Sequence, residues 1–154
     1  MAGNPINEAR YYEFINALPQ GTVNKHGWVV AGVPFYNAGD AVRYAMKHTT
    51  AEPRDHAIVL DPVKARELAA VLYPEFERLY QLYEDMREDA HKSLNAQVAT
   101  RDGIEKKTLM DDIHWDLAQE EVFRRQGYCT AVLDTGDAIR KRRYELFQIL
   151  RIDR

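Results

Sequence analysis

Residues 61–100, DPVKARELAAVLYPEFERLYQLYEDMREDAHKSLNAQVAT, form the longest stretch of this sequence that keeps a helical period and contains no glycine. Asp61 can accept hydrogen bonds from the first free backbone N–H groups of a helix. Pro62 suits the first helical position, because its missing N–H would be unpaired there. These two residues predict that a helix begins here. Pro74 removes one backbone hydrogen bond, so we expect either a kink or a short break at that point.

Beyond Pro74, apolar residues recur at alternating short steps that place them on one narrow stripe of a helix. The members of this stripe are Phe76, Leu79, Tyr80, Tyr83, Met86, Ala90, Leu94 and Gln97 or Val98. Such a stripe is typical of a coiled-coil seam. We expect residues 61–127 to form a helical hairpin packed on itself, and an intermolecular coiled coil is the alternative.

The chain before this stretch predicts a small β-containing unit. Asn7 can cap a first helix that stops at Pro19. Residues 22–48 predict a ββα unit, with β-prone pieces at 22–24, 28–31 and 33–35 followed by a helix that begins at Asn37 or Asp40. Pro34 should lie on an edge strand, since it cannot donate to a ladder. Residues 56–60 lack polar alternation, which predicts a strand covered on both faces.

The chain after the central stretch predicts a second long helix, which Thr108 can cap. We expect this helix to end near Arg125, with Gly127 as its left-handed terminator. Its apolar residues fall on two sides, which predicts a helix sandwiched between neighbours. One side carries Leu109, Ile113 and Leu117, and the other carries Trp115, Ala118 and Val122.

The last segment, residues 128–154, predicts a short strand and a C-terminal helix. We expect the strand at residues 128–133 and a turn at 134–137. Residues 139–152 fit a helix better than a strand, because arginine, lysine, glutamate and leucine dominate them. The sequence as a whole predicts one α+β domain that is predominantly helical, with a small antiparallel β-hairpin or ββα unit packed on a long helical hairpin.

Composition limits the classes of protein to consider. The 154 residues are 45% hydrophobic and 29% charged, which is typical of a globular domain. A net charge of −3 argues against a surface that binds nucleic acid throughout. Cys129 is the single cysteine, so no internal disulfide can form. The chain shows no apolar leader and no apolar run of membrane-spanning length. We expect a cytoplasmic protein without a membrane partner.

Three residue patterns could support a metal site or catalysis. Glu88 with His91, and Asp111 with His114, have the spacing of metal-binding pairs on facing helices. The helical wheel turns Glu88 toward solvent, so both pairs are interpreted as surface pairs and no metal or cofactor is expected. Cys129 lies in a hydrophobic run, which is typical of buried packing. No catalytic residue is assigned, although a small enzyme or nucleotide-binding protein of unassigned type stays as an alternative.

Charge is polarised along the chain, and this suggests two binding surfaces. The central helix carries a predicted partner-binding acidic face of Glu77, Glu84, Asp85, Glu88 and Asp89. The C-terminal segment carries the basic residues Arg140, Lys141, Arg142, Arg143 and Arg151. The first hypothesis is a non-enzymatic binding protein with a regulatory, inhibitory or assembly role, whose partner is another protein or a second copy in a homo-oligomer. The alternative is a nucleic-acid-associated accessory protein that uses the basic segment.

Overall fold

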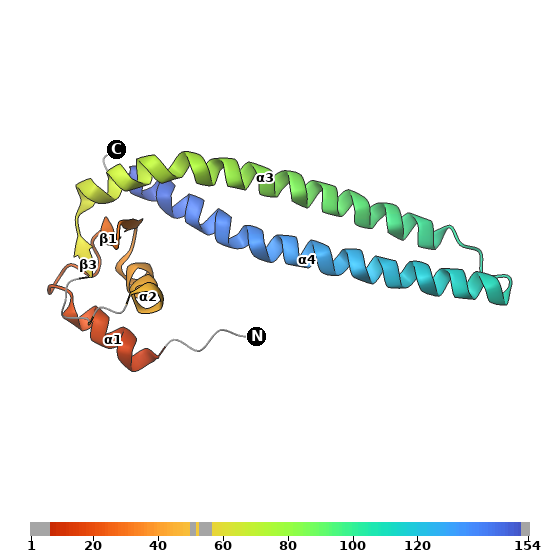
Figure 1. Ribbon diagram of the computed structural model, residues 1–154, viewed down its shortest axis with the longest axis horizontal. Helices are drawn as coiled ribbons and strands as arrows, with labels where there is room; N and C mark the ends of the chain where they lie inside the picture. The colour runs from red at the N-terminus through yellow and green to blue at the C-terminus, as the bar shows by residue number, and fades with distance from the viewer. Residues whose placement is uncertain (1–6, 50–51, 53–56, 152–154) are drawn as a thin grey trace. The chain divides into compact units, whose positions relative to one another are not determined.

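The computed structural model describes residues 7–49, 52 and 57–151 (Figure 1). These residues are 76% helical, with a three-stranded antiparallel sheet and a long helical hairpin, which confirms the predicted fold class. The chain divides into two compact units. The first contains residues 1–75 and 142–154, and the second contains residues 76–141. Both boundaries fall inside helices rather than in a loop.

The first unit begins with the helices and strands that local signals predict. α1 (Glu8–Ala17) is capped by Asn7, whose side-chain oxygen accepts a hydrogen bond from the backbone N–H of Arg10 at 3.3 Å. β1 (Trp28–Val30) and β2 (Val33–Phe35) follow, and then α2 (Ala38–His48). The strand expected at residues 22–24 is wrong. Backbone hydrogen bonds from Thr22 to Pro19 and from Lys25 to Thr22 close two turns there instead.

The sheet of the first unit has the strand order β2-β1-β3, where β3 is Ile58–Leu60. Pro34 lies in β2, at the edge, as predicted. The expectation that β3 is covered on both faces is wrong, because Ile58 is buried while Val59 is 48% exposed. A small antiparallel sheet needs cover on one face only. His56, the expected start of this strand, lies outside the described residues.

Large side chains fill the core of the first unit. Trp28, Phe14, Val30 and Val42 are fully buried, and the Trp28 indole N–H donates to the backbone oxygen of Lys25 at 2.9 Å. The helix α2 packs on all three strands and on α1. The unit therefore has a hydrophobic core of its own.

α3 (Pro62–Asp102) is one helix of 41 residues. Asp61 caps it, since its carboxylate accepts a hydrogen bond from the backbone N–H of Lys64 at 3.0 Å. Pro74 lies inside this helix and does not split it, so the short break that the sequence left open does not occur. The helix continues through Asp102, beyond the stretch of residues 61–100 from which it was predicted.

α4 (Leu109–Arg151) corrects the sequence prediction most strongly. It begins after Thr108 as predicted, and the Thr108 hydroxyl accepts a hydrogen bond from the backbone N–H of Asp111 at 3.2 Å. The helix continues through Gly127, so the predicted terminator is wrong. The strand at 128–133 and the turn at 134–137 are wrong for the same reason, since both segments are helical. Residues 139–151 are helical, which settles the question of helix or strand in favour of helix.

The physical reason for this correction lies in the period of the buried residues. Ala118, Val122, Cys129, Val132 and Gly136 are buried at steps that keep one helical side facing α3. A short apolar run such as 128–133 fits a strand and a buried helical segment equally well when it is considered alone.

The second unit, residues 76–141, is a helical hairpin in which α3 and α4 run side by side (Figure 1). Its seam is made largely of small residues, which include Ala90, Ala118 and Cys129. Gly136 faces the ring of Tyr83 so closely that a Cβ atom would overlap the ring. Cross-helix hydrogen bonds add to this packing, such as the one from Arg125 to the backbone oxygen of Ser93 at 2.9 Å.

Candidate functional site: an apolar groove on the hairpin

The two apolar sides predicted for the start of α4 have different environments. On one side, Ala118 and Val122 are buried in the seam against α3 and Trp115 is half-buried. On the other side, Leu109, Ile113 and Leu117 are 76%, 43% and 59% exposed. Met110, which is 57% exposed, lies among them. We name these four exposed residues the tip stripe. Only one of the two expected neighbours is found in the part of the chain that the structure describes.

A groove runs along the hairpin between α3 and α4, beside the seam. One part of it has a volume of about 350 Å³ and an almost wholly apolar lining. The lining residues are Leu79, Leu82, Tyr83, Met86, Tyr128, Ala131, Val132, Thr135 and Ile139. An adjoining hollow of about 430 Å³ shares Met86 and Tyr128 with it and adds Asp89, Ala90, Ser93, Arg124 and Arg125, so charged side chains border its far end. We name the two together the hairpin groove.

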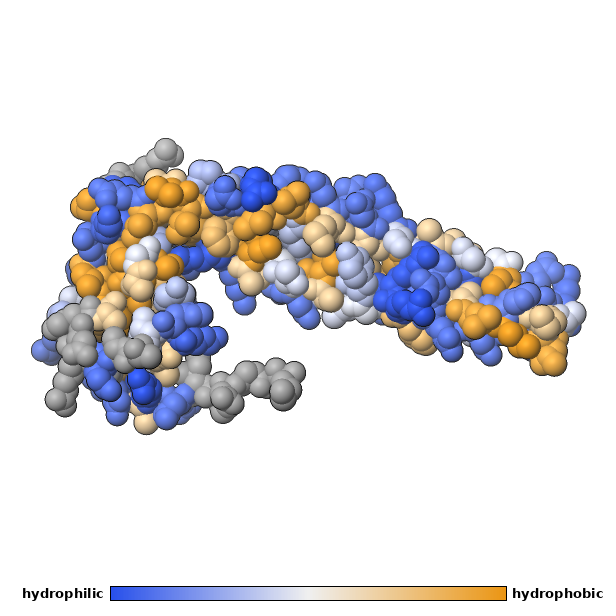
Figure 2. Space-filling view, viewed as in Figure 1, coloured by the Kyte–Doolittle hydropathy of each residue, from blue (hydrophilic) through white to orange (hydrophobic). Residues whose placement is uncertain are grey.

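Large side chains at the edge of the hairpin groove are open to solvent. Leu82, Met86 and Tyr128 are 48%, 49% and 55% exposed. Hydrophobic residues also appear on the molecular surface over α3 and at the end of the hairpin where α3 and α4 are joined (Figure 2). An apolar groove bounded by a few polar groups can hold apolar side chains of a ligand in one orientation.

The predicted acidic face lies mostly outside the groove and is partly neutralised by neighbours on its own helix. Glu84 pairs with Arg87 at 2.6 Å, and Glu88 pairs with Lys92 at 2.9 Å. The Lys92 ammonium lowers the pKa of Glu88. Asp85 accepts a hydrogen bond from Gln81 at 3.4 Å, and Glu77 also has an interaction partner. Asp89 is the one member of the predicted set that lines the groove.

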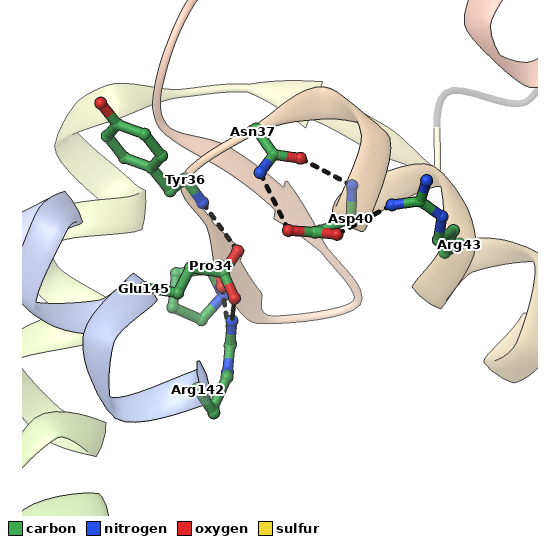
Figure 3. Close-up of polar contacts among 7 residues, drawn as sticks. All are labelled: Pro34, Tyr36, Asn37, Asp40, Arg43, Arg142 and Glu145. Atoms are coloured by element: carbon green, nitrogen blue, oxygen red, sulfur yellow. Dashed lines mark hydrogen bonds and ion pairs between the residues drawn. The ribbon is translucent and has the colours of Figure 1, made fainter. Parts of the chain in front are cut away.

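The predicted basic segment does not form one basic face. Arg140 pairs with Asp137 at 2.8 Å, and the Arg151 guanidinium lies over the Phe147 ring. The Arg142 side chain makes its interactions within the first unit. It donates to the backbone oxygen of Pro34 and to Glu145, each at 2.6 Å (Figure 3). Its guanidinium also lies over the Phe35 ring. Arg143 also has an interaction partner, and Lys141 is exposed.

Glu145 completes this attachment in the first unit. Its carboxylate accepts a hydrogen bond from the backbone N–H of Tyr36 at 3.0 Å (Figure 3). Burial raises the pKa of Glu145, although Arg142 and the Tyr36 N–H both act in the opposite direction. The side chains of Arg142 and Glu145 therefore have structural roles, because they form hydrogen bonds with the Pro34 carbonyl and the Tyr36 N–H in and just after β2.

The metal and cysteine candidates occupy ordinary positions. Within residues 7–49, 52 and 57–151, no three His, Cys, Asp or Glu side chains lie together in a group that could hold a metal ion. Asp111 serves as a helix cap, and the backbone N–H groups of Lys107 and Thr108 lower its pKa. Cys129 is buried in the hairpin seam.

In comparisons with known proteins, no family model, curated protein or solved structure matched this chain. None of the helices in the described part of the chain is both long enough and apolar enough to span a membrane.

Sequence reasoning missed most of the groove. It placed Tyr128 and Ala131 in a strand and left Leu82 unassigned. The signal that could have found them is a second helical stripe on α4, in which Tyr128, Ala131 and Thr135 follow one another at helical steps. Their position opposite Leu82 and Met86 depends on how the two helices pair.

Proposed function

We propose that this chain is a non-enzymatic binding protein with a regulatory, inhibitory or assembly role, and that the hairpin groove binds a helical polypeptide. One observation carries the proposal, namely that the hairpin buries mainly small residues, with Tyr83 as the large exception, while Leu82, Met86 and Leu117 are exposed. Contiguous exposed apolar surface is typical of interaction sites, because covering it removes it from water.

The shape and the chemistry of the groove favour a helix as the ligand. The groove extends from Leu79 to Ser93 along α3, which corresponds to about 21 Å at a rise of about 1.5 Å per residue. An amphipathic helix places apolar side chains at three- and four-residue steps, which matches a long groove between two helices. Asp89 and Arg124 at the polar end can fix the direction of the bound helix.

The remaining acidic residues have a secondary role in this proposal. Glu77, Glu84, Asp85 and Glu88 contribute to the electrostatic attraction of a partner rather than to direct contact. Exposed charges chiefly change the rate of association, and their pairing with neighbouring lysine and arginine leaves little net binding energy to gain.

Native mass spectrometry of the gently purified full-length chain tests the proposal. We expect the wild type to retain a second polypeptide, and the double variant Leu82→Glu/Met86→Glu to be a bare monomer with unchanged helix content by circular dichroism. The matched control, Asn95→Glu/Ala99→Glu, adds the same charge at exposed positions of α3 outside the groove lining and should behave as wild type. A wild-type chain that stays monomeric would refute the proposal.

A further inference from the structure

One face of α4 carries the large apolar side chains of the tip stripe and, further along the helix, residues that line the hairpin groove. At about 100° per residue, the tip stripe falls within an arc of about 100°. The same face continues through Glu120 and Arg124 to Tyr128, Ala131 and Thr135, which line the hairpin groove or border it. Along the helix, this face therefore presents first the large apolar side chains of the tip stripe, then the charged side chains of Glu120 and Arg124, and then the side chains that line the groove.

We propose that the helix bound in the hairpin groove is the tip of a second copy of this chain. The two hairpins pack antiparallel about a two-fold axis near residue 122, so that the tip stripe of each copy fills the groove of the other. This inference rests on the proposed function and names its partner. The contact is isologous, so each interaction occurs twice.

Charge complementarity sets the register. With the axis near residue 122, Glu120 of each copy lies opposite Arg124 of the other, which gives two ion pairs at the centre. Arg124 is well exposed, with 78% of its side chain open to solvent, and its pair with Glu121 uses one terminal nitrogen. A guanidinium has five N–H donors, so it can hold a second carboxylate at the same time.

Side-chain size agrees with this register. Ile113 lies opposite Ala131, and Leu117 lies opposite Gly127, so large residues meet small ones along the contact. Gly127 stands inside a helix, where glycine is less favourable than alanine. Nothing in the described chain lies within 4 Å of the position that a Cβ would take there, so packing within the chain does not explain the glycine. A close approach of Leu117 from the second copy does explain it.

Disulfide trapping tests both the partner and the register. The variant Ile113→Cys/Ala131→Cys, in a Cys129→Ala background and with the full chain, should form covalent dimers on mild oxidation. The two positions are 18 residues apart on one helix, about 27 Å, which is too far for a bridge within one chain. The control Ile113→Cys/Thr130→Cys moves one thiol to an exposed position on another side of α4 and should stay monomeric.

Charge exchange provides a second test that does not depend on thiols. Glu120→Arg should raise the dimer dissociation constant at least tenfold, as measured by sedimentation equilibrium. The variant places an arginine opposite Arg124 in each of the two central pairs. Glu120→Arg/Arg124→Glu should restore most of the affinity, because it only reverses each pair.

The outcomes separate the two proposals. Equal trapping in both cysteine variants, or none in either, overturns the second-copy inference. If native mass spectrometry still shows a different bound polypeptide, the proposed function stands without the second-copy inference. If the wild type retains no polypeptide and no trapping occurs, both proposals fail.

Discussion

The two compact units of this chain use their apolar residues in opposite ways. The first unit buries its largest side chains, such as Trp28 and Phe14, and the hairpin of residues 76–141 buries Ala90, Ala118 and Gly136 while Leu82, Met86 and Leu117 stay exposed. Burial of large apolar side chains supplies most of the stability of a fold. The first unit therefore has a core of large buried side chains, and the exposed large residues of the hairpin are the reason we propose that it binds a partner.

The largest effect should follow from emptying the core of the first unit. Trp28→Ala should lower the free energy of unfolding by about 3–5 kcal/mol, because it removes a fully buried side chain and leaves a cavity. Denaturant unfolding followed by tryptophan-independent circular dichroism measures this loss. The control Val59→Thr, on an exposed position of the same sheet, should change the value by less than about 0.5 kcal/mol. A loss below about 1 kcal/mol for Trp28→Ala would contradict a complete core.

The stability of the hairpin seam should be sensitive to the addition of a single methyl group. Gly136→Ala should destabilise the chain by about 1–3 kcal/mol, because its Cβ would overlap the Tyr83 ring. Gly127→Ala, in the same helix but with open space around it, should instead stabilise the isolated chain by about 0.5–1 kcal/mol. Thermal unfolding at low concentration compares the two. A neutral or stabilising effect of Gly136→Ala would show that a small residue is not required at this position of the seam.

A smaller effect is expected at the β1–β2 turn. Ala31 has φ 48° and Gly32 has φ 77°, which is the pattern of a hairpin turn that favours asparagine and glycine. Ala31→Asn should therefore stabilise the first unit by about 0.5 kcal/mol, because asparagine adopts this conformation with less strain than alanine. Ala31→Val should destabilise it, since a branched side chain strongly resists positive φ. A melting-temperature comparison of the two variants checks the order.

The smallest effect concerns the buried carboxyl of the first unit. The pKa of Glu145 is raised above its ordinary value of 4.5, so its folded state holds the proton more tightly than the unfolded state. Stability from this group is therefore present below pH 4.5 and is lost as the pH rises through the folded-state pKa. Relative to Glu145→Gln, the wild type should gain stability as the pH falls from neutral toward 4.5. A difference between the two proteins that is constant with pH would contradict the raised pKa.

Local signals predicted the fold class and most helix starts. Asn7, Asp61 and Thr108 each cap a helix through a side chain that bonds to the backbone three residues on, and such short-range contacts are visible in sequence. Long-range pairing was not visible. Arg142 binds Pro34 across 108 residues, and the groove exists only because α3 lies beside α4. Gly127 resembled a helix end because glycine commonly ends helices, whereas here the helix continues.

The rate of methionine oxidation tests most directly whether the hairpin is covered. Met86 in the groove and Met110 in the tip stripe are 49% and 57% exposed in the single chain, and Met46 of α2 serves as an internal reference. Peroxide oxidation would be measured by mass spectrometry in gently lysed expressing cells and in the purified, diluted chain. We predict that Met86 and Met110 oxidise several-fold more slowly in the lysate, relative to Met46, and that Leu117→Glu removes the protection. Equal relative rates in the two samples would contradict the account.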